Sequence, residues 1–354
     1  MSHADFRLSL VVPVYNEEES IDAFISAIDN ELAPLKDQLE IVFVNDGSRD
    51  RTREVVEQAI ARDPRVTLVN LARNFGKEAA MTAGLHQAKG DAIVPMDVDL
   101  QDPPALILEF VKLWQTGDYD TVFGIRVDRS ADTPMKRLTA GGFYRFFNAL
   151  STSTKLPENA GDFRLIDRKV VEALKQLPER NRFMKGLFAW AGFRAVGVPY
   201  ERPARHAGET KFNYWKLWNF ALDGLLSFSS WPLRVWSYVG VGVSLIAFLY
   251  ILKIITQVLF FGIDVPGYAS LMSVMLFLGG IQLLSLGIIG EYIGRMFVEV
   301  KQRPVYLIEG VYGQYAKQDE AQPQDGAATD SKKSAGKKAA TVKAADDQQE
   351  QAPQ

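Results

Sequence analysis

Short runs of β-branched and other apolar residues alternate with longer amphipathic segments between Leu8 and about Gly124. This alternation is typical of βαβ units, in which helices cover both faces of a parallel sheet. The sequence therefore predicts a Rossmann-like α/β fold with a mostly parallel sheet. The expected strands lie near 8–14, 40–45, 66–71, 91–96 and 119–124, and the expected helices near 18–32, 50–62, 75–89 and 103–116.

The loops that follow the expected strands should line a single site. Ligands of doubly wound sheets bind beyond the carboxyl ends of the strands, where these loops gather. Here the loops contain both acids and bases, the mixture that the metal and phosphates of a nucleotide sugar require. The loops are residues 13–17, 45–48, 71–77, 97–102 and 124–126.

An acidic cluster follows the fourth expected strand. Asp97, Asp99 and Asp102 fall within six positions, directly after an apolar run. Carboxylates at the end of a buried strand can hold Mg²⁺ or Mn²⁺, because these cations prefer oxygen ligands and keep open positions for phosphate. The alternative is a turn or helix cap that is acidic for local reasons. The acids and bases of the neighbouring loops favour the metal site.

The composition excludes several kinds of site. The chain has no cysteine and three histidines, so it has no disulfide, thiolate nucleophile or zinc–thiolate site, and a histidine-rich metal site is not expected. Its net charge is −3, and no nucleic-acid partner is expected. No apolar segment precedes Leu8, so no cleavable signal peptide is expected and the catalytic part should remain in the cytoplasm.

Two apolar segments near 236–261 and 269–293 are each longer than the about 20 residues that cross a bilayer. The loop 262–268 between them has no Lys or Arg, whereas Arg234 precedes the first segment and Arg295 follows the second. By the positive-inside rule, both ends of the pair are cytoplasmic. We expect a multi-pass protein of the inner membrane with a transmembrane hairpin; a buried hairpin in a soluble core is the alternative.

The regions around the hairpin differ in composition. Residues 214–233 mix aromatic rings with a few charges, which suits a helix at headgroup depth, although a core helix has a similar pattern. The chain after Gln314 is polar and should be disordered. The expected divisions are a catalytic domain over 1–212, interfacial helices over 213–234, the hairpin over 235–294, a cytoplasmic return segment over 295–313 and a disordered tail over 314–354.

Three motifs, at residues 11–18, 44–48 and 97–99, resemble those of the family 2 glycosyltransferases, which have the GT-A fold. The resemblance implies that Asp99, helped by Gln101, binds the Mg²⁺ or Mn²⁺ that bridges the diphosphate of the donor. It also implies that the first loops contact the nucleoside. The nucleotide-sugar site that follows from it consists of Pro13, Tyr15, Glu17, Asp46, Arg73, Lys77 and Asp97.

Three further segments, at 71–78, 161–165 and 181–186, resemble the polyprenyl-phosphate glycosyltransferases, and the bacterial bactoprenol glucosyltransferases among them. The resemblance implies transfer of a single glucose from UDP-glucose to undecaprenyl phosphate with inversion, by a homotetramer. The alternatives are the same reaction with another sugar, such as mannose, N-acetylhexosamine or aminoarabinose, and a non-catalytic scaffold that binds the lipid carrier.

The same resemblance implies residues for the acceptor and for catalysis. Its acceptor-phosphate site consists of Arg126, Arg137, Arg205 and Lys211, because Arg binds phosphate through paired donors and Lys through its charge. Its catalytic residues are Asp97, Asp99 and Asp162. Two roles stay open for Asp162, which either acts as a base or orients Arg164.

Overall fold

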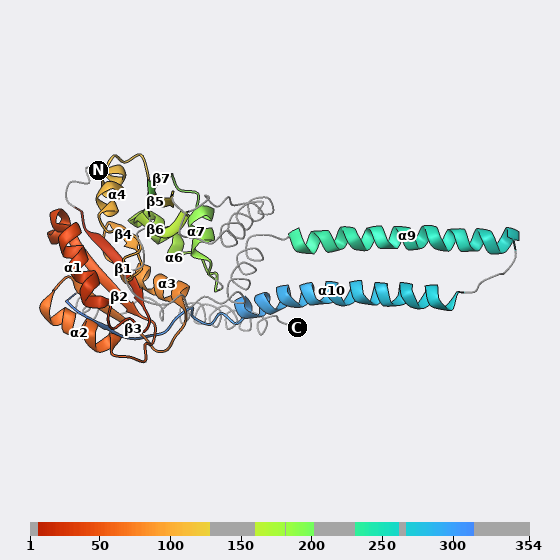
Figure 1. The fold of residues 1–354 in the computed structure, drawn as a ribbon, viewed down its shortest axis with the longest axis horizontal. Helices are drawn as coiled ribbons and strands as arrows, with labels where there is room; N and C mark the ends of the chain where they lie inside the picture. The colour runs from red at the N-terminus through yellow and green to blue at the C-terminus, as the bar shows by residue number, and fades with distance from the viewer. Residues whose placement is uncertain (1–5, 128–159, 181, 202–230, 262–266, 315–354) are drawn as a thin grey trace, which may run out of the picture.

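The computed structural model describes residues 6–127, 160–180, 182–201, 231–261 and 267–314. The described residues form an eight-stranded sheet with the strand order β7-β5-β6-β4-β1-β2-β3-β8 (Figure 1). All strands run parallel except β6 and β8, which confirms the expected α/β fold with a mostly parallel sheet. The strands are β1 (Leu8–Val14), β2 (Leu39–Asn45), β3 (Val66–Leu71), β4 (Ala92–Pro95), β5 (Thr121–Arg126), β6 (Ala160–Asp167), β7 (Ala195–Tyr200) and β8 (Ile308–Tyr312).

Helices cover both faces of the sheet, because successive residues of a strand point to opposite faces. On β1, Leu10 and Val12 belong to one hydrophobic cluster and Val11 to the other. The first cluster includes residues of α1 (Ile21–Glu31), α2 (Thr52–Arg62) and α4 (Leu106–Gln115), and η1 (Ala33–Gln38) follows α1. The second includes residues of α3 (Lys77–Gln87), α6 (Arg168–Lys175) and α7 (Met184–Trp190).

Three strands of this sheet, β6, β7 and β8, were not expected from the sequence. β6 lies between β4 and β5 and runs antiparallel to both. Its first residues therefore lie at the edge where the parallel strands end. β8 follows the last helix of the chain and pairs antiparallel with β3, so the expected return segment 295–313 contributes a strand to the sheet.

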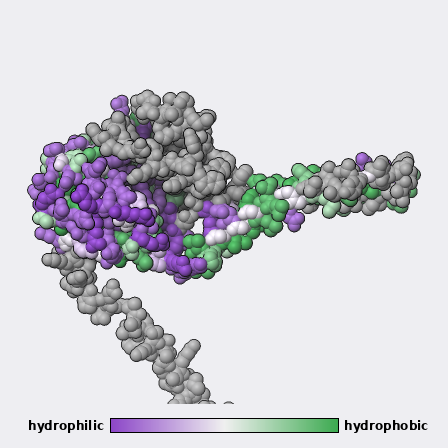
Figure 2. Space-filling view, turned by 60° about the horizontal axis from the view of Figure 1, so that its bottom comes forward, coloured by the Kyte–Doolittle hydropathy of each residue, from purple (hydrophilic) through white to green (hydrophobic). Residues whose placement is uncertain are grey.

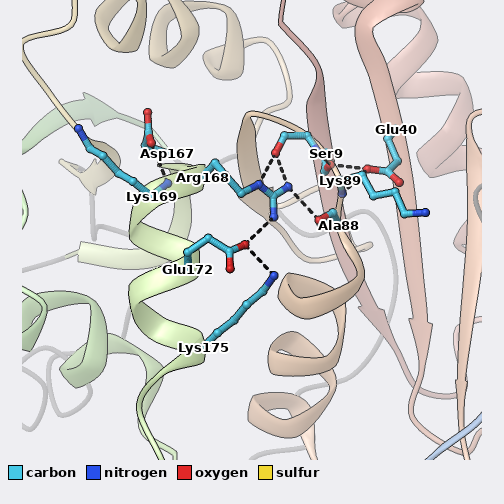
Figure 3. A network of polar contacts seen from close by, with 10 residues as sticks. Ser9, Glu40, Ala88, Lys89, Asp167, Arg168, Lys169, Glu172 and Lys175 are labelled. Atoms are coloured by element: carbon cyan, nitrogen blue, oxygen red, sulfur yellow. Dashed lines mark hydrogen bonds and ion pairs between the residues drawn. The ribbon is translucent and has the colours of Figure 1, made fainter. Parts of the chain in front are cut away.

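A polar network fixes the opposite edge of the sheet, where the parallel strands begin (Figure 3). The buried Glu40 of β2 accepts hydrogen bonds from the hydroxyl of Ser9 at 2.5 Å and from the backbone amide of Lys89 at 2.9 Å. Arg168 donates to the carbonyl of Ala88 at 2.8 Å. Such partners offset the cost of burying a carboxylate. The network holds the turn between α3 and β4 at the base of the sheet.

A long helical arm extends from the sheet domain. It consists of α9 (Trp231–Phe261) and α10 (Tyr268–Val300), and in Figure 2 it is largely apolar where the sheet domain is largely hydrophilic. Among the described residues, one stretch, Phe277–Val300, is long and apolar enough to cross a membrane; the apolar run of α9, Tyr238–Ile254, is shorter. The length and composition of the helices thus support one of the two expected membrane spans.

The chain beyond α10 returns to the sheet domain. Glu309 of β8 accepts hydrogen bonds from Arg53 of α2 at 3.1 Å and from the buried Asn70 of β3 at 2.7 Å. Close to the end of α10, Glu299 accepts a hydrogen bond from the backbone amide of Arg180 at 2.8 Å. These contacts, which the sequence did not predict, attach the end of the arm to the sheet domain.

Candidate active site

A pocket lies at the carboxyl ends of the parallel strands. Five residues that the sequence placed in the site line it together: Pro13, Lys77, Asp97, Arg126 and Asp162. The first four follow or end parallel strands or begin a helix at that edge. Asp162 reaches the same edge because β6 is antiparallel and starts there.

Lys77, the first residue of α3, lies between two carboxylates of the pocket. Its Nζ atom is 2.6 Å from Oδ1 of Asp97 and 3.8 Å from Oδ2 of Asp162. Burial lowers the pKa of Lys77, but Asp97 and Asp162 raise it by more, so the ammonium stays charged. Its side chain remains 46% exposed and is therefore accessible to an anionic ligand.

Asp162 is held as an anion by the surrounding cations. Burial raises its pKa, but Lys185, Lys77 and Arg164 lower it further, so that the pKa of Asp162 lies below its usual range. Its Oδ1 atom is buried and has no hydrogen-bond partner among the described residues. A buried anion needs such nearby positive charge. Arg164 donates to the carbonyl of Gly161 at 2.8 Å, and its guanidinium is fixed beside Asp162 in this way.

Asp99 and Gln101 lie on a strained turn after β4. The carboxylate of Asp99 accepts a hydrogen bond from the backbone amide of Gln101 at 3.2 Å. Between them, Leu100 has a φ of 54°, a left-handed conformation that costs such a residue about 1–3 kcal/mol. Leu100 packs against the hydrophobic core, which holds the turn in place. Strain of this kind is concentrated at functional sites.

The side chains of Asp99 and Gln101 suit a divalent cation that is coordinated by both protein and phosphate oxygens. In the part of the chain that the structure describes, no group of three or more His, Cys, Asp or Glu side chains could hold a metal ion by itself. Mg²⁺ is commonly bound through one or two carboxylates together with substrate phosphates and water. A complete cage of protein ligands is therefore not required, and the oxygen donors present suit such a cation.

The loops after β2 and β3 interlock beside the pocket. The carboxylate of Asp46 accepts hydrogen bonds from the backbone amides of Phe75 at 2.7 Å and Gly76 at 2.9 Å. Burial raises the pKa of Asp46 more than these bonds lower it. Gly47 has a φ of 65°, and a Cβ atom added to it would lie 2.6 Å from the backbone of Arg73, so only glycine fits. Asp46 thus shapes the loop before α3; its contact with a nucleoside stays a prediction.

Three other residues of the predicted donor site lie in the same loops. Tyr15 is 36% exposed. Glu17 accepts a hydrogen bond from the hydroxyl of Ser20 at 3.0 Å. The guanidinium carbon of Arg73 lies 4.4 Å from the ring centre of Phe75. All three are placed at the carboxyl edge of the sheet. Their contact with a donor stays a prediction.

Arg126, the last residue of β5, is flanked by a buried tyrosine and a buried aspartate. Its Nε atom donates to the hydroxyl of Tyr200 at 3.2 Å, and its Nη2 atom lies 3.8 Å from Oδ1 of Asp102. The Tyr200 hydroxyl donates to the same Asp102 oxygen at 2.6 Å. Burial and the Asp102 carboxylate raise the pKa of Tyr200 to about 12, so its hydroxyl stays neutral.

Sequence reasoning missed several residues of this site. Asp102 stands in the acidic cluster, but nothing in the sequence marked it as a partner of Arg126. Tyr200 ends a strand that was not expected. Lys185 belongs to a motif noted above, at 181–186, and its proximity to Asp162 arises only in the fold. The other predicted acceptor residues, Arg137, Arg205 and Lys211, lie outside the described residues.

Comparison with known proteins identifies the family. Residues 9–175 match the profile of "Glycosyl transferase family 2", and residues 231–296 match that of the "GtrB C-terminal hairpin". The SfII prophage-derived bactoprenol glucosyl transferase of Shigella flexneri is 51% identical over 305 residues, which cover 86% of this chain and 97% of the relative. The chain belongs to glycosyl transferase family 2. As a family 2 glycosyltransferase it is an enzyme.

Two further relatives have similar coverage. The prophage bactoprenol glucosyl transferase homolog of Escherichia coli K12 is 50% identical over 86% of this chain and 99% of its own length. An uncharacterized glycosyltransferase of Synechocystis is 52% identical over 87% of this chain and 96% of its own length. A solved mannosyltransferase from Pyrobaculum calidifontis is 24% identical over 55% of each chain, with a TM-score of 0.39, a likeness too weak to support an argument.

The family match covers most of the pocket of this glycosyltransferase. The matched range includes β1 to β6, and with them Lys77, Asp97, Arg126 and Asp162. The matched hairpin covers α9 and most of α10. Tyr200 on β7 and the strand β8 lie outside both ranges.

Proposed function

We propose that this protein transfers one glucose residue from UDP-glucose to undecaprenyl phosphate at the cytoplasmic face of the inner membrane. The observation that carries the proposal is the identity of about half of all residues, over nearly the whole length, with enzymes named bactoprenol glucosyl transferases. The pocket supports it chemically, because Lys77 and Arg126, which could bind phosphate groups, line it together with Asp97 and Asp102 of the acidic turn. The lipid-linked sugar would supply the modification of a cell-surface glycan.

The proposed reaction is a direct displacement. An oxygen of the acceptor phosphate forms a bond to the anomeric carbon of glucose, while the bond from that carbon to the diphosphate breaks and UDP leaves with the electron pair. A phosphate monoester has a second pKa of about 6, so its oxygen is already an anion at neutral pH and no base is needed. A single displacement inverts the anomeric configuration.

The residues of the pocket have separate roles in this proposal. Lys77 stabilises the charge that develops on the leaving diphosphate, an electrostatic effect that is often the largest in catalysis. Arg126 binds the acceptor phosphate. Asp162 has a lowered pKa and is a poor base, so we assign it to the orientation of Lys77 and Lys185. Arg73 would bind the donor phosphates, and Arg137, Arg205 and Lys211 would complete the acceptor site.

The oxygen ligands at the turn after β4 support a requirement for Mg²⁺ or Mn²⁺. Asp99 and Gln101 would hold the cation, which when bound neutralises part of the diphosphate charge. Lys77, whose Nζ atom lies 2.6 Å from Asp97, would supply positive charge in addition to that of the metal. The nucleoside would lie against Pro13, Tyr15, Glu17 and Asp46.

The membrane arrangement is also part of the proposal. The hairpin match over 231–296 supports a second span in α9. By the positive-inside rule, both termini would be cytoplasmic and the loop between the helices would lie on the opposite side of the inner membrane. The remaining divisions of the chain, the interfacial helices over 213–234 and the disordered tail over 314–354, and assembly as a homotetramer stay predictions.

A transfer assay tests the function. Purified protein is incubated with Mg²⁺, undecaprenyl phosphate and, separately, radiolabelled UDP-glucose, UDP-N-acetylglucosamine or GDP-mannose, and label is counted in the organic extract. Label from UDP-glucose alone is the expected result. Label from another donor would keep the reaction and change the sugar. Label from none of them would favour an untested donor sugar or the non-catalytic scaffold.

A further inference from the structure

We propose that Tyr200 and Asp102 are positioning residues, which hold Arg126 toward the acceptor phosphate and join it to the turn that carries Asp99. The inference rests on the function proposed above, since it takes the ligand of Arg126 to be a phosphate. It adds two residues that act through Arg126 to the machinery of the acceptor site.

The contacts of Arg126 divide its donors between protein and ligand. Arginine has five N–H donors in a planar fork. The Nε donor is used by the Tyr200 hydroxyl at 3.2 Å, while the guanidinium lines the pocket. Gly161 leaves space beside it, because a Cβ atom added there would lie 3.5 Å from Nη2 of Arg126. The Nη2 atom lies 3.8 Å from Oδ1 of Asp102, too far for a hydrogen bond, so we infer that the terminal amino groups can offer paired donors to a phosphate.

Packing fixes the ring of Tyr200. Tyr200 is the direct neighbour of Arg126 in the parallel pairing of β5 and β7. Its ring crosses Gly124 so closely that an added Cβ would lie 2.6 Å from the ring, and it contacts Phe163 edge to face at 6.2 Å between ring centres. Because Tyr200 is 7% exposed and Asp102 5% exposed, the hydroxyl has little freedom to exchange Asp102 for water.

Asp102 connects this arrangement to the donor side of the pocket. It follows Gln101 directly, and the strained residue Leu100 separates both from Asp99. A shift of the turn therefore moves the carboxylate that accepts from Tyr200 at 2.6 Å. Arg126, which would bind the acceptor, is thus joined through Tyr200 and Asp102 to the turn on which Asp99 and Gln101 lie.

Kinetics with single and double variants test the inference. Tyr200→Phe removes only the hydroxyl, and the matched control is Tyr306→Phe, whose hydroxyl lies 2.7 Å from His86 outside the pocket. We expect Tyr200→Phe to raise KM for undecaprenyl phosphate about tenfold, the loss of one hydrogen bond to a charged group. KM for UDP-glucose at saturating acceptor should change much less, and the control should behave like the wild type.

A double-mutant cycle separates positioning from general destabilisation. If Tyr200 acts through Arg126, Tyr200→Phe has no further effect on KM for the acceptor in an Arg126→Ala background. A full effect in that background, or equal rises in both KM values, would overturn the inference. If Tyr200→Phe does not fold, Asp102→Ala, which removes the acceptor of the Tyr200 hydroxyl, gives the same readout. If the wild type transfers no sugar to undecaprenyl phosphate, the proposed function fails as well; if it does, and Tyr200→Phe matches the control, only this inference fails.

Discussion

The ammonium of Lys77 bridges Asp97 and Asp162, at 2.6 Å and 3.8 Å respectively, across the centre of the pocket. Removing it leaves two carboxylates without their shared cation at the position where diphosphate charge would develop. We expect Lys77→Met to lower kcat about 100-fold, as for the loss of one preorganised donor at such a charge. Lys36→Met, on an exposed lysine of η1, is the control and should remain fully active. Steady-state kinetics that showed equal activities would remove Lys77 from the catalytic site.

Asp99 is the acidic residue that we assign to the cation. Asp99→Asn should abolish turnover while the thermal unfolding of the protein is unchanged, because the asparagine can still accept the hydrogen bond from the Gln101 amide. The exposed Asp37→Asn variant serves as the control. Treatment of the wild type with a chelator should also stop the reaction, and added Mg²⁺ or Mn²⁺ should restore it. Retained turnover in Asp99→Asn would contradict the metal assignment.

Glu78 gives the protein a pH-dependent stability. Burial and the neighbouring Asp162 raise its pKa to about 7, although the Met184 amide donates to it at 3.2 Å. Because the ordinary value is 4.5, the folded state binds this proton more tightly than the unfolded state does. The contribution is therefore complete below pH 4.5 and is lost as the pH rises through about 7.

The measurement is the Tm of wild type and Glu78→Gln at about pH 5 and about pH 8.5, on either side of this titration. The Tm of the wild type should fall more between the two values than that of the variant, in which the group no longer titrates. Equal changes in Tm would show that Glu78 does not titrate in this range.

Glu309 should stabilise the sheet domain. Glu309→Ala removes the acceptor of the buried Asn70 amide group and of Arg53, and an unsatisfied buried donor costs about 1–3 kcal/mol. We expect the free energy of unfolding to fall by that amount. Glu57→Ala is the matched control, since it removes a surface partner of the same arginine and should have a much smaller effect. Equal losses in the two variants, measured by denaturant unfolding, would argue against a stabilising role for β8.

Local sequence patterns were sufficient to predict the central strands of the sheet and the position of part of the site. The expected strands at 8–14, 40–45 and 66–71 agree with β1, β2 and β3 to within one residue, because each is an apolar run bounded by turn or helix signals. The rule that ligands bind at the carboxyl ends of such strands placed Pro13, Lys77 and Asp97 in one site, and the three residues line one pocket. Their contact with a ligand stays a prediction.

Features that depend on distant pairing were not accessible in this way. Tyr200 meets Arg126 only because β5 and β7 are adjacent, and Glu309 meets Asn70 only because the chain returns from α10 to the edge of the sheet. Neither pairing leaves a periodicity or a motif in the local sequence. Asp162 was placed in the site by resemblance, and the antiparallel direction of β6 gives the physical reason.

The mass of the lipid product shows directly whether this enzyme makes a lipid-linked glucose. Purified protein with Mg²⁺ and undecaprenyl phosphate receives equal amounts of UDP-glucose, UDP-N-acetylglucosamine and GDP-mannose labelled with distinct isotopes, and the extracted lipid is analysed by mass spectrometry. We expect one product, undecaprenyl phosphate with a single hexose that carries the isotope of UDP-glucose. A product with an N-acetylhexosamine, with the isotope of GDP-mannose or with more than one sugar would contradict this expectation.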